Sequence, residues 1–277
     1  MTIRSSRLTA PACVSARIVE RELLAPDIVS VWLRAGRIAE TIKPGQFVQI
    51  QIPDSRRDVS GAMRSTCPEP FLRRPLSIAQ QRGNRIRLVF RVIGQGTARL
   101  AASRPGEEWN LLGPLGRPAP ALRNRDVILV GGGIGIPPLL FLAERIAGAN
   151  RVLALLGARN RPDLILRSEF RALRTKLALA TDDGSLGRKG LVTDNLQSVV
   201  CNLQSELPPV VFACGPRPML KRVKELTPGI ESYAFWEERM GCGTGICYGC
   251  AVKRAGSNSY IRFCQEGPVL RLSEIEI

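Results

Sequence analysis

The first 120 residues alternate short apolar runs with turns of glycine, proline and polar residues. Strand-like apolar runs occur at residues 16–19, 28–33, 47–52, 76–79 and 86–92. Turn signals such as Pro44-Gly45 and Gly83-Asn84 separate them. Short strands that follow one another without helices are typical of a small antiparallel barrel. The polar segment at residues 54–70 is predicted to be a loop inserted between two of these strands.

After residue 120 the pattern changes to strands that alternate with helices. Strand-like runs at residues 126–130, 151–156, 177–180 and 210–213 alternate with helical periodicity at residues 138–146 and 163–175. This alternation is typical of a parallel sheet with crossover helices. Beyond residue 235 the periodicity fades, and glycine and cysteine become frequent. We therefore predict a multidomain α+β fold: an antiparallel β-barrel domain (residues 1–120), an α/β domain with a parallel sheet (121–234) and a small C-terminal module (235–277).

Charge makes nucleic-acid binding a candidate, because 40 Lys and Arg residues against 24 Asp and Glu residues give a net charge of +16. The basic residues are scattered and form no basic helix, so a solvated, arginine-rich surface is favoured over a phosphate footprint. No apolar run approaches the ~18 residues that a membrane-spanning helix needs. The N-terminal residues also lack the apolar stretch of a signal peptide. We expect a cytoplasmic protein that binds neither nucleic acid nor membranes.

Histidine is absent from the sequence, and this narrows the chemistry. Without imidazole there is no mixed cysteine–histidine zinc finger, no Rieske ligation and no Ser–His–Asp triad. Four of the eight cysteines follow residue 241. Any reaction must therefore use cysteine, carboxylates or a bound cofactor.

The strongest motif is formed by Cys242, Cys247, Cys250 and Cys264, with the spacing C-x4-C-x2-C-x13-C. This is the spacing of plant-type ferredoxins, which bind a 2Fe–2S cluster. The glycines between the first three cysteines let the backbone approach the cluster without Cβ clashes. The alternative is a four-cysteine zinc site, but such sites usually show two separate C-x2-C pairs and the chain has one. A zinc-binding basic nucleic-acid module is therefore kept as an alternative of a different class.

Four weaker motifs point to bound phosphate groups or other ligands. Arg74, in R-R-P-L-S, can grip a pyrophosphate with paired hydrogen bonds. Gly94-Gln95-Gly96-Thr97 opens a helical stretch, where backbone amides favour phosphate. The glycines at residues 131–135 follow a strand directly, but they do not form a complete G-x-G-x-x-G. Residues 214–219 place a further turn at the carboxyl end of a strand, where ligands bind in open α/β sheets.

In this order, the motifs resemble the ferredoxin–NADP reductase superfamily. The elements that carry this resemblance are R-P-L-S, G-x-G-T, L-G-P-L-G, G-G-G-x-G and C-G-P-x-P-M. The segments ERMGCGTGICYGCAVK and TDDGSLGRKGLVTD resemble the electron-transfer subunits of type B dihydroorotate dehydrogenase. The resemblance runs from about residue 12 to the end, although the segment at residues 54–70 is longer than usual for the family.

The resemblance implies an oxidoreductase subunit with three cofactors. FAD would be held in the barrel domain by Arg74, Pro75, Leu76, Ser77, Val89, Phe90, Arg91, Gly96 and Thr97. NAD would be bound in the α/β domain by Gly131, Gly132, Gly133, Gly135, Cys214, Gly215 and Pro216. The 2Fe–2S cluster would be bound by the four cysteines of the C-terminal module. Arg159 and Arg161 would suit a 2′-phosphate, so NADP stays an alternative to NAD.

The same resemblance implies a partner and a direction of electron flow. Members of the family pair with an FMN-containing dihydroorotate dehydrogenase catalytic subunit, as a heterotetramer, in pyrimidine biosynthesis. Electrons would pass from FMN through the cluster and FAD to NAD⁺, with no side-chain acid or base in this subunit. The nearest alternative is an NADPH-dependent ferredoxin reductase or sulfide dehydrogenase subunit of the same superfamily. In those relatives the first ligand position is often Asp, so Cys242 favours the dihydroorotate system.

Overall fold

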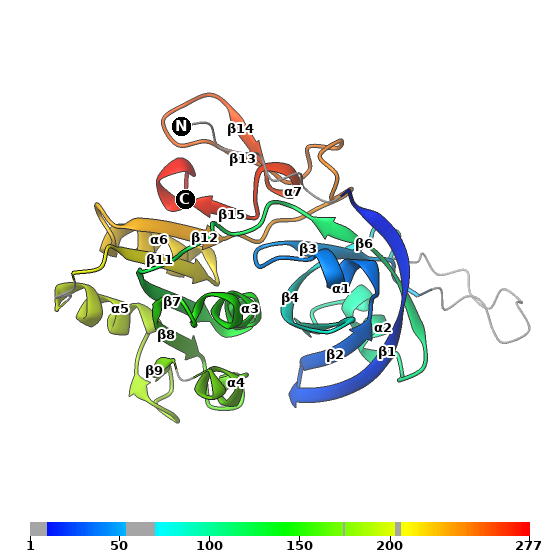
Figure 1. The fold of residues 1–277 in the computed structure, drawn as a ribbon, viewed down its shortest axis with the longest axis horizontal. Helices are drawn as coiled ribbons and strands as arrows, with labels where there is room; N and C mark the ends of the chain where they lie inside the picture. Colours follow the sequence, from blue (N-terminus) through cyan, green and yellow to red (C-terminus); the bar gives the residue numbers. More distant parts are fainter. Residues whose placement is uncertain (1–9, 54–69, 174, 203–205) are drawn as a thin grey trace, which may run out of the picture.

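The structure is a computed structural model that describes residues 10–53, 70–173, 175–202 and 206–277. The inserted loop predicted at residues 54–70 lies almost entirely outside the described residues. Figure 1 shows a barrel on the right, an α/β domain on the left and a small C-terminal module above both. No described helix combines the length and apolar character needed to cross a bilayer.

The barrel is closed and antiparallel, as predicted, with the strand order β1-β2-β5-β4-β3-β6. Its elements are β1 (Ala12–Ala25), β2 (Ile28–Arg34), α1 (Arg37–Thr41), β3 (Phe47–Ile50), β4 (Arg74–Arg82), β5 (Arg85–Arg91), α2 (Gln95–Ala102) and β6 (Glu108–Leu115). Successive side chains of a strand point to opposite faces. In β3, Val48 and Ile50 therefore pack into the barrel core, whereas Phe47 packs into a separate core that includes the C-terminal module.

The α/β domain holds a seven-stranded sheet in the order β10-β9-β8-β7-β11-β12-β15. The strands are β7 (Asp126–Gly132), β8 (Arg151–Ala158), β9 (Lys176–Thr181), β10 (Arg188–Lys189), β11 (Pro209–Cys214), β12 (Glu231–Phe235) and β15 (Val269–Arg271). The helices are η1 (Gly133–Gly135), α3 (Ile136–Ile146), α4 (Arg167–Ala172), α5 (Val192–Cys201) and α6 (Arg217–Leu226). β7 to β12 pair in parallel, so their carboxyl ends share one edge of the sheet.

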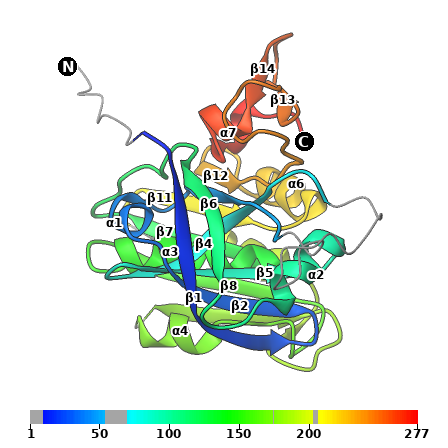
Figure 2. The ribbon, with the colours of Figure 1, turned by 90° about the vertical axis from the view of Figure 1, so that its right-hand side faces the viewer.

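The C-terminal module is small and tied to both other parts. It contains β13 (Ala251–Lys253), β14 (Tyr260–Arg262), α7 (Phe263–Glu266), β15 and η2 (Leu272–Glu274). β15 runs antiparallel to β12 and so extends the sheet of the α/β domain. The Arg117 backbone amide, just after the barrel, donates to the Gly267 carbonyl oxygen at 2.6 Å. Figure 2 shows α7 and the β13–β14 hairpin standing above the barrel strand β6.

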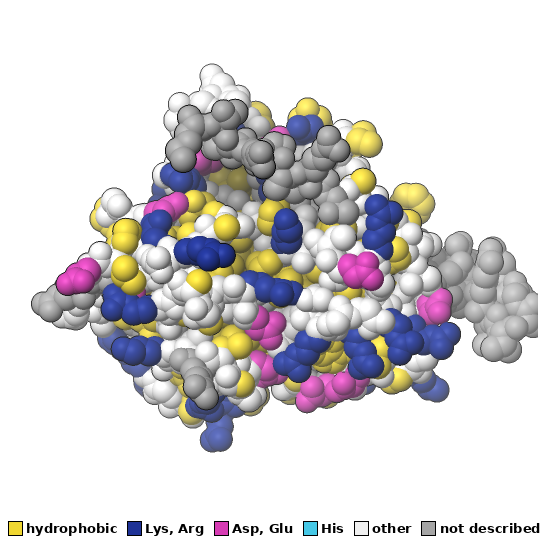
Figure 3. Space-filling model, viewed as in Figure 1, with side chains coloured by type: hydrophobic (Ala, Val, Ile, Leu, Met, Phe, Trp, Pro, Cys, Tyr) yellow, Lys and Arg dark blue, Asp and Glu magenta, His cyan; other side chains and the backbone are white. Residues whose placement is uncertain are grey.

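Charged side chains bridge the barrel and the α/β domain. Arg87 on β5 is buried and donates to Glu169 on α4 at 2.7 Å. Arg91, at the end of β5, donates to Asp27 at 2.5 Å and lies 3.2 Å from Asp163. The Arg87–Glu169 and Arg91–Asp163 pairs join the two parts and are largely shielded from water, so they fix these parts more firmly than surface ion pairs would. Elsewhere, Figure 3 shows basic side chains spread over one face and interspersed with acidic ones.

The structure differs from the sequence prediction in two elements. The predicted helix at residues 163–175 shortens to α4, because Leu166 adopts a left-handed conformation with φ of 60° and helical geometry begins only after it. The L-G-P-L-G element at residues 112–116, whose adjacent glycine and proline predict a turn, is mostly strand, since Gly113 pairs with Ala12 inside β6. Pro114 lies where the β6–β3 ladder shifts register, a position that tolerates its missing N–H.

Candidate functional site

The four predicted cluster ligands form two pairs. Cys242, Cys247 and Cys250 lie on the glycine-rich cysteine loop (residues 241–250), and Cys264 lies on α7. The Sγ atoms of Cys250 and Cys264 are 3.4 Å apart, and a thiol hydrogen bond joins Cys242 to Cys247. Of the described His, Cys, Asp and Glu side chains, no three surround a single metal position. The two pairs fit a binuclear cluster, in which each iron takes two of the four thiolates.

The backbone of the cysteine loop leaves room for sulfur. A Cβ atom on Gly241 or Gly249 would lie 3.3 or 3.5 Å from the Cys247 Sγ. The amides of Thr244 and Gly249 donate to the Sγ atoms of Cys242 and Cys247 at 3.3 and 3.4 Å. These amides are the kind of donor that stabilises thiolate sulfur around an iron–sulfur centre.

Cys242 and Cys264, one from each pair, have pKa values that are shifted in opposite directions. Burial opposes ionisation of Cys242, but hydrogen bonds from Thr244 and Cys247 outweigh it and lower its pKa to about 6. Burial raises the pKa of Cys264 to about 12, and the hydrogen bond with Cys250 acts in the same direction. Because metal ligation requires a thiolate, iron binding at Cys264 must displace the proton that burial favours there.

A cavity of about 320 Å³, the barrel cavity, opens beside β4 and β5. It is lined by Phe47, Arg74, Pro75, Leu76, Ser77, Val89, Phe90, Arg91, Ile93, Thr97, Ile134, Trp236, Glu237, Glu238, Met240 and Pro268. Eight of the nine residues predicted to hold FAD are in this set, and Gly96 is the exception.

Gly96 contributes by leaving space for Arg74. A Cβ atom at Gly96, in the first turn of α2, would lie 2.7 Å from the Arg74 Nε. The guanidinium therefore lies against the N-terminus of α2, which carries partial positive charge and free amides. Thr97 accepts hydrogen bonds from the amides of Ile93 and Gly94 and so fixes the turn that precedes the helix. Two anion-attracting groups thus converge at the barrel cavity, as the diphosphate of a dinucleotide requires.

A second cavity of about 640 Å³, the sheet cavity, lies at the carboxyl ends of the parallel strands. Its wall includes Gly132, Gly133, Gly135, Gly215 and Pro216, five of the seven residues predicted to bind the nicotinamide nucleotide. Arg217, in the turn predicted at residues 214–219, also lines it, whereas Asp182, Thr193 and Arg222 line it and were not predicted. Binding at this edge follows the rule that open α/β sheets take ligands outside the carboxyl ends of their strands.

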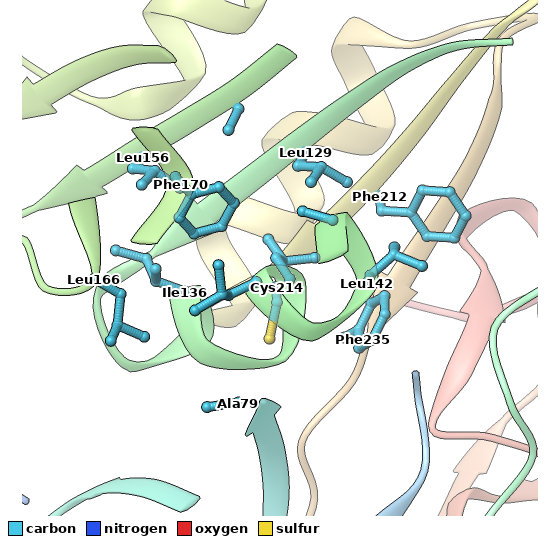
Figure 4. Packing of buried hydrophobic residues seen from close by; sticks show 14 of the residues in the cluster. Ala79, Leu129, Ile136, Leu142, Leu156, Leu166, Phe170, Phe212, Cys214 and Phe235 are labelled. Carbon is cyan, nitrogen blue, oxygen red and sulfur yellow. The ribbon is translucent and has the colours of Figure 1, made fainter. Parts of the chain in front are cut away.

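Gly131 and Cys214 lie behind the wall of the sheet cavity. A Cβ atom at Gly131 would meet Ile136, Leu156 and Leu139 at 3.1 to 3.3 Å, so this glycine permits close packing of α3 on the sheet. Cys214 is buried in the core cluster that Figure 4 shows, beside Ile136. Its carbonyl oxygen would lie only 2.2 Å from a Cβ atom at Gly135. Both residues therefore shape the cavity through packing.

The two cavities share a wall formed by Arg91, Ile134, Trp236 and Glu237. Glu237 reaches water in the cavities, yet protein surrounds it on most sides, and this burial raises the pKa of its carboxyl. Burial also raises the pKa of the Cys214 thiol, and the negative charge of Glu237 raises it further. The two cavities thus adjoin each other at these four side chains.

Trp236 and Glu237 were missed by the sequence analysis, although a signal was available. They follow the buried strand β12 directly, at the same sheet edge as the glycine turns. Trp236 also stacks on Phe263, with ring centroids 5.7 Å apart, and Phe263 precedes Cys264, a predicted cluster ligand. Trp236 therefore connects the shared wall to the cysteine pairs. The rule that ligands bind at carboxyl strand ends, applied to the last parallel strand, would have identified both residues.

The arginines considered for a 2′-phosphate are not grouped in one place. Arg159 lines the sheet cavity, but its guanidinium lies 3.2 Å from Asp163. Arg161 lines a separate hollow beside Glu22 and Arg87. The pair therefore does not form one phosphate pocket.

Comparison with known proteins gives two family matches. The domain described as "Iron-sulfur cluster binding domain of dihydroorotate dehydrogenase B" matches residues 237–276, and "Oxidoreductase NAD-binding domain" matches residues 129–225. A protein of Geobacillus thermodenitrificans named "Dihydroorotate dehydrogenase B (NAD(+)), electron transfer subunit" is 37% identical, over 93% of this chain and 96% of its own. The chain belongs to the family of dihydroorotate dehydrogenase B electron transfer subunits. A family member from Fusobacterium nucleatum is 35% identical over 94% of this chain and 97% of its own.

Solved structures agree with this membership. A structure described as that of an NADH-dependent reduced ferredoxin-NADP oxidoreductase superposes with a TM-score of 0.80 at 29% identity. It covers 94% of this chain and 89% of its own. The barrel, the parallel-sheet domain and the cluster-binding module expected for a dihydroorotate dehydrogenase B electron transfer subunit are therefore confirmed.

Proposed function

We propose that this chain passes electrons from the FMN of a dihydroorotate dehydrogenase catalytic subunit, through a 2Fe–2S cluster and FAD, to NAD⁺. The observation that carries the proposal is spatial. Two cysteine pairs, a cavity with an arginine at a helix N-terminus and a cavity at the strand ends adjoin one another around Trp236. The family members named above are NAD(+) proteins, which supports NAD as the acceptor.

When bound, the cluster and FAD supply one-electron and hydride chemistry that side chains cannot. Under the proposal, Arg74 and the first turn of α2 hold the diphosphate of FAD, and Pro75, Leu76 and Ser77 lie along the flavin. The glycine turns at residues 132–135 and 215–216 hold the nicotinamide nucleotide. Trp236 and Glu237 lie between the two cavities. Cys242, Cys247, Cys250 and Cys264 hold the irons.

The partner is proposed to dock on the cysteine loop. Ile246 is 82% exposed and Tyr248 is 60% exposed, and they flank the exposed Cys247. Large apolar side chains that stand free beside a charged centre are typical of a surface that another protein covers. An FMN-containing subunit at this position would bring its flavin to the cluster edge. The heterotetramer and the cytoplasmic location expected from the sequence stay predictions.

The proposal is tested first on the purified chain. Flavin analysis and assays of iron and acid-labile sulfide are expected to return FAD together with about two irons and two sulfides per chain. A colourless, zinc-containing protein would refute it. The chain alone is expected to oxidise NADH with an artificial acceptor and to leave dihydroorotate untouched. Dihydroorotate oxidation is expected only after the co-purified FMN subunit is added, so activity of the chain alone on dihydroorotate would contradict the proposed roles.

A second function is favoured by the likeness to the NADH-dependent reduced ferredoxin-NADP oxidoreductase. In that case reduced ferredoxin, not an FMN subunit, would supply the electrons. Stopped-flow mixing with reduced ferredoxin separates the two functions. Fast cluster reduction by ferredoxin, together with no co-purifying FMN protein, would favour the second function.

A further inference from the structure

One buried side chain of the barrel faces the cysteine loop with no polar partner. Gln49 on β3 is fully buried, and among the described residues neither its Nε2 nor its Oε1 has a hydrogen-bond partner. A buried carboxamide without partners is costly, and such groups in native proteins call for an explanation. The position of Gln49 relative to the cluster ligands supplies one.

Gln49 lies against the backbone next to a predicted iron ligand. A Cβ atom at Gly243 would come within 2.8 Å of the Gln49 Nε2 and Cγ. Gly243 follows Cys242 directly and has φ of +73°, so the loop turns over the carboxamide at a position that favours glycine. The amide is therefore in van der Waals contact with the first turn of the cysteine loop.

A second glutamine beside the cysteine loop differs from Gln49, because its amide has a polar partner. Gln265, next to Cys264, lies equally close to the loop, where a Cβ atom at Gly245 would be 2.4 Å from its Cγ. Its Nε2 donates to the Thr244 carbonyl oxygen at 2.7 Å. Gln265 thus holds the backbone of the loop, whereas the amide of Gln49 is left for an acceptor that the polypeptide does not provide.

The acceptors that the cysteine loop would enclose are sulfurs. Thiolate and sulfide sulfurs of an iron–sulfur cluster accept hydrogen bonds, and these bonds help to set its potential. We propose that the Gln49 carboxamide donates a hydrogen bond to a sulfur of the 2Fe–2S cluster on the Cys242 side. This inference rests on the proposed function, because it requires the cluster to occupy the cysteine pairs.

The same residue connects the cluster to the flavin strand. Gln49 pairs across the β3–β4 ladder with Pro75, which lines the barrel cavity. Phe47, two residues earlier on the same face of β3, lines that cavity as well. The Gln49 side chain and the cavity-lining Phe47 side chain therefore lie on the same short strand, β3. Under the proposal, this strand holds the cluster at a fixed position relative to the flavin.

The test compares Gln49→Leu and Gln49→Met with Gln51→Leu, an exposed control just beyond β3. A hydrogen bond to sulfur stabilises the reduced cluster, which carries more negative charge. Both apolar variants are therefore expected to bind iron and sulfide normally, with a lower cluster midpoint potential and altered EPR g-values. Gln49→Glu, which adds negative charge without a donor, is expected to lower the potential further. The control is expected to match the wild type.

A measurement without the cluster gives an independent check. In the cluster-free protein, Gln49→Leu replaces an unpaired amide with an apolar group of similar size, so its melting temperature is expected to equal or exceed that of the wild type. A lower value would show that the amide serves the polypeptide itself and would overturn the inference.

The outcomes separate the two proposals. A wild-type protein without iron and sulfide would overturn the proposed function. A wild-type protein with the cluster, combined with unchanged potential and EPR spectrum in both apolar variants, would overturn only the role of Gln49. The amide would then bind a buried water or merely fill space.

Discussion

The sheet cavity and the cysteine loop hold their ligands in opposite ways. The sheet cavity is built from backbone turns at the ends of parallel strands, which the α/β core fixes in place. The cysteine loop has no regular secondary structure between β12 and β13 and offers side chains instead. Regular strands keep their shape without a ligand, whereas a ligand-bearing loop gains much of its order from the metal. Removing a ligand group should therefore harm the loop and the sheet in different ways.

The largest effect is expected from Cys247→Ser, which removes one thiolate from the cysteine loop. Iron and sulfide content should fall to near background, because a serine hydroxyl is a poor replacement for a thiolate ligand of iron. FAD content and NADH oxidation with an artificial acceptor should persist, since the residues predicted to hold FAD and NAD lie in the barrel and the α/β domain and none lies in the cysteine loop. Cys201→Ser, an exposed cysteine on α5, is the control. Loss of FAD with an intact cluster would contradict the separation of the two sites.

The sheet cavity should be sensitive to added volume rather than to lost ligands. Gly135→Ala would place a Cβ atom 2.2 Å from the Cys214 carbonyl oxygen, and backbone atoms cannot move aside easily. We expect the free energy of unfolding to fall by about 1–3 kcal/mol, and NADH to bind more weakly. Urea denaturation and NADH titration measure both. Gly148→Ala, where no other atom lies near the added carbon, is the control and should change neither the free energy of unfolding nor NADH binding. If Gly135→Ala also leaves both unchanged, the Cys214 carbonyl does not restrict this turn.

The barrel cavity lies between these extremes, because one side chain and one helix end act together. Arg74→Ala should weaken FAD binding by roughly ten- to a hundredfold, the loss of a charge-assisted bond of about 1.5–3 kcal/mol. Equilibrium dialysis of the flavin measures this loss. Arg73→Ala is the matched control, since its guanidinium binds Asn110 at 2.6 Å outside the cavity. Equal flavin retention in both variants would remove Arg74 from the FAD site.

The smallest effect concerns two neighbouring carboxyls of opposite behaviour. Burial raises the folded-state pKa of Glu237, so its ionisation lowers stability as the pH rises through and beyond the ordinary value of 4.5. Burial opposes ionisation of Glu238, but hydrogen bonds from Arg239, Arg217 and Trp236 outweigh it and lower its pKa. Glu238 therefore contributes stability above pH 4.5 that is lost as the pH falls.

Thermal melts of the cofactor-free variants between pH 4 and pH 8 test this contrast. Glu237→Gln should melt above the wild type at neutral pH, and the difference should shrink on acidification. Glu238→Gln should melt below it at neutral pH, with the same convergence in acid. Shifts of the same sign at neutral pH would show that the two carboxyls do not differ as described.

The fold and the ligand motifs could be predicted from the sequence, because both depend on patterns among residues that are close together in the chain. Strand alternation identified the barrel, strand–helix alternation identified the parallel sheet, and cysteine spacing pointed to four cysteines that the structure brings together as two pairs. The sequence was not sufficient for Gln49, Trp236 and Glu237, because their roles come from contacts between segments far apart in the chain. Gln49 meets Gly243 only after the barrel and the C-terminal module have assembled, and Trp236 meets Phe263 only after the C-terminal module has folded. The domain boundaries and the individual binding residues stay predictions.

The ion pairs of Arg87 and Arg91 have a consequence for motion during turnover. Many two-domain enzymes close over their substrate by hinge bending, which needs an interface that separates easily. Here, opening the barrel away from the α/β domain would separate the Arg87 and Arg91 guanidinium groups from Glu169 and Asp163, their carboxylate partners in the α/β domain. The spacing between the barrel cavity and the sheet cavity is thus set at folding. Under the proposed function, a nicotinamide ring in the sheet cavity would reach a flavin in the barrel cavity only where side chains of the shared wall move aside.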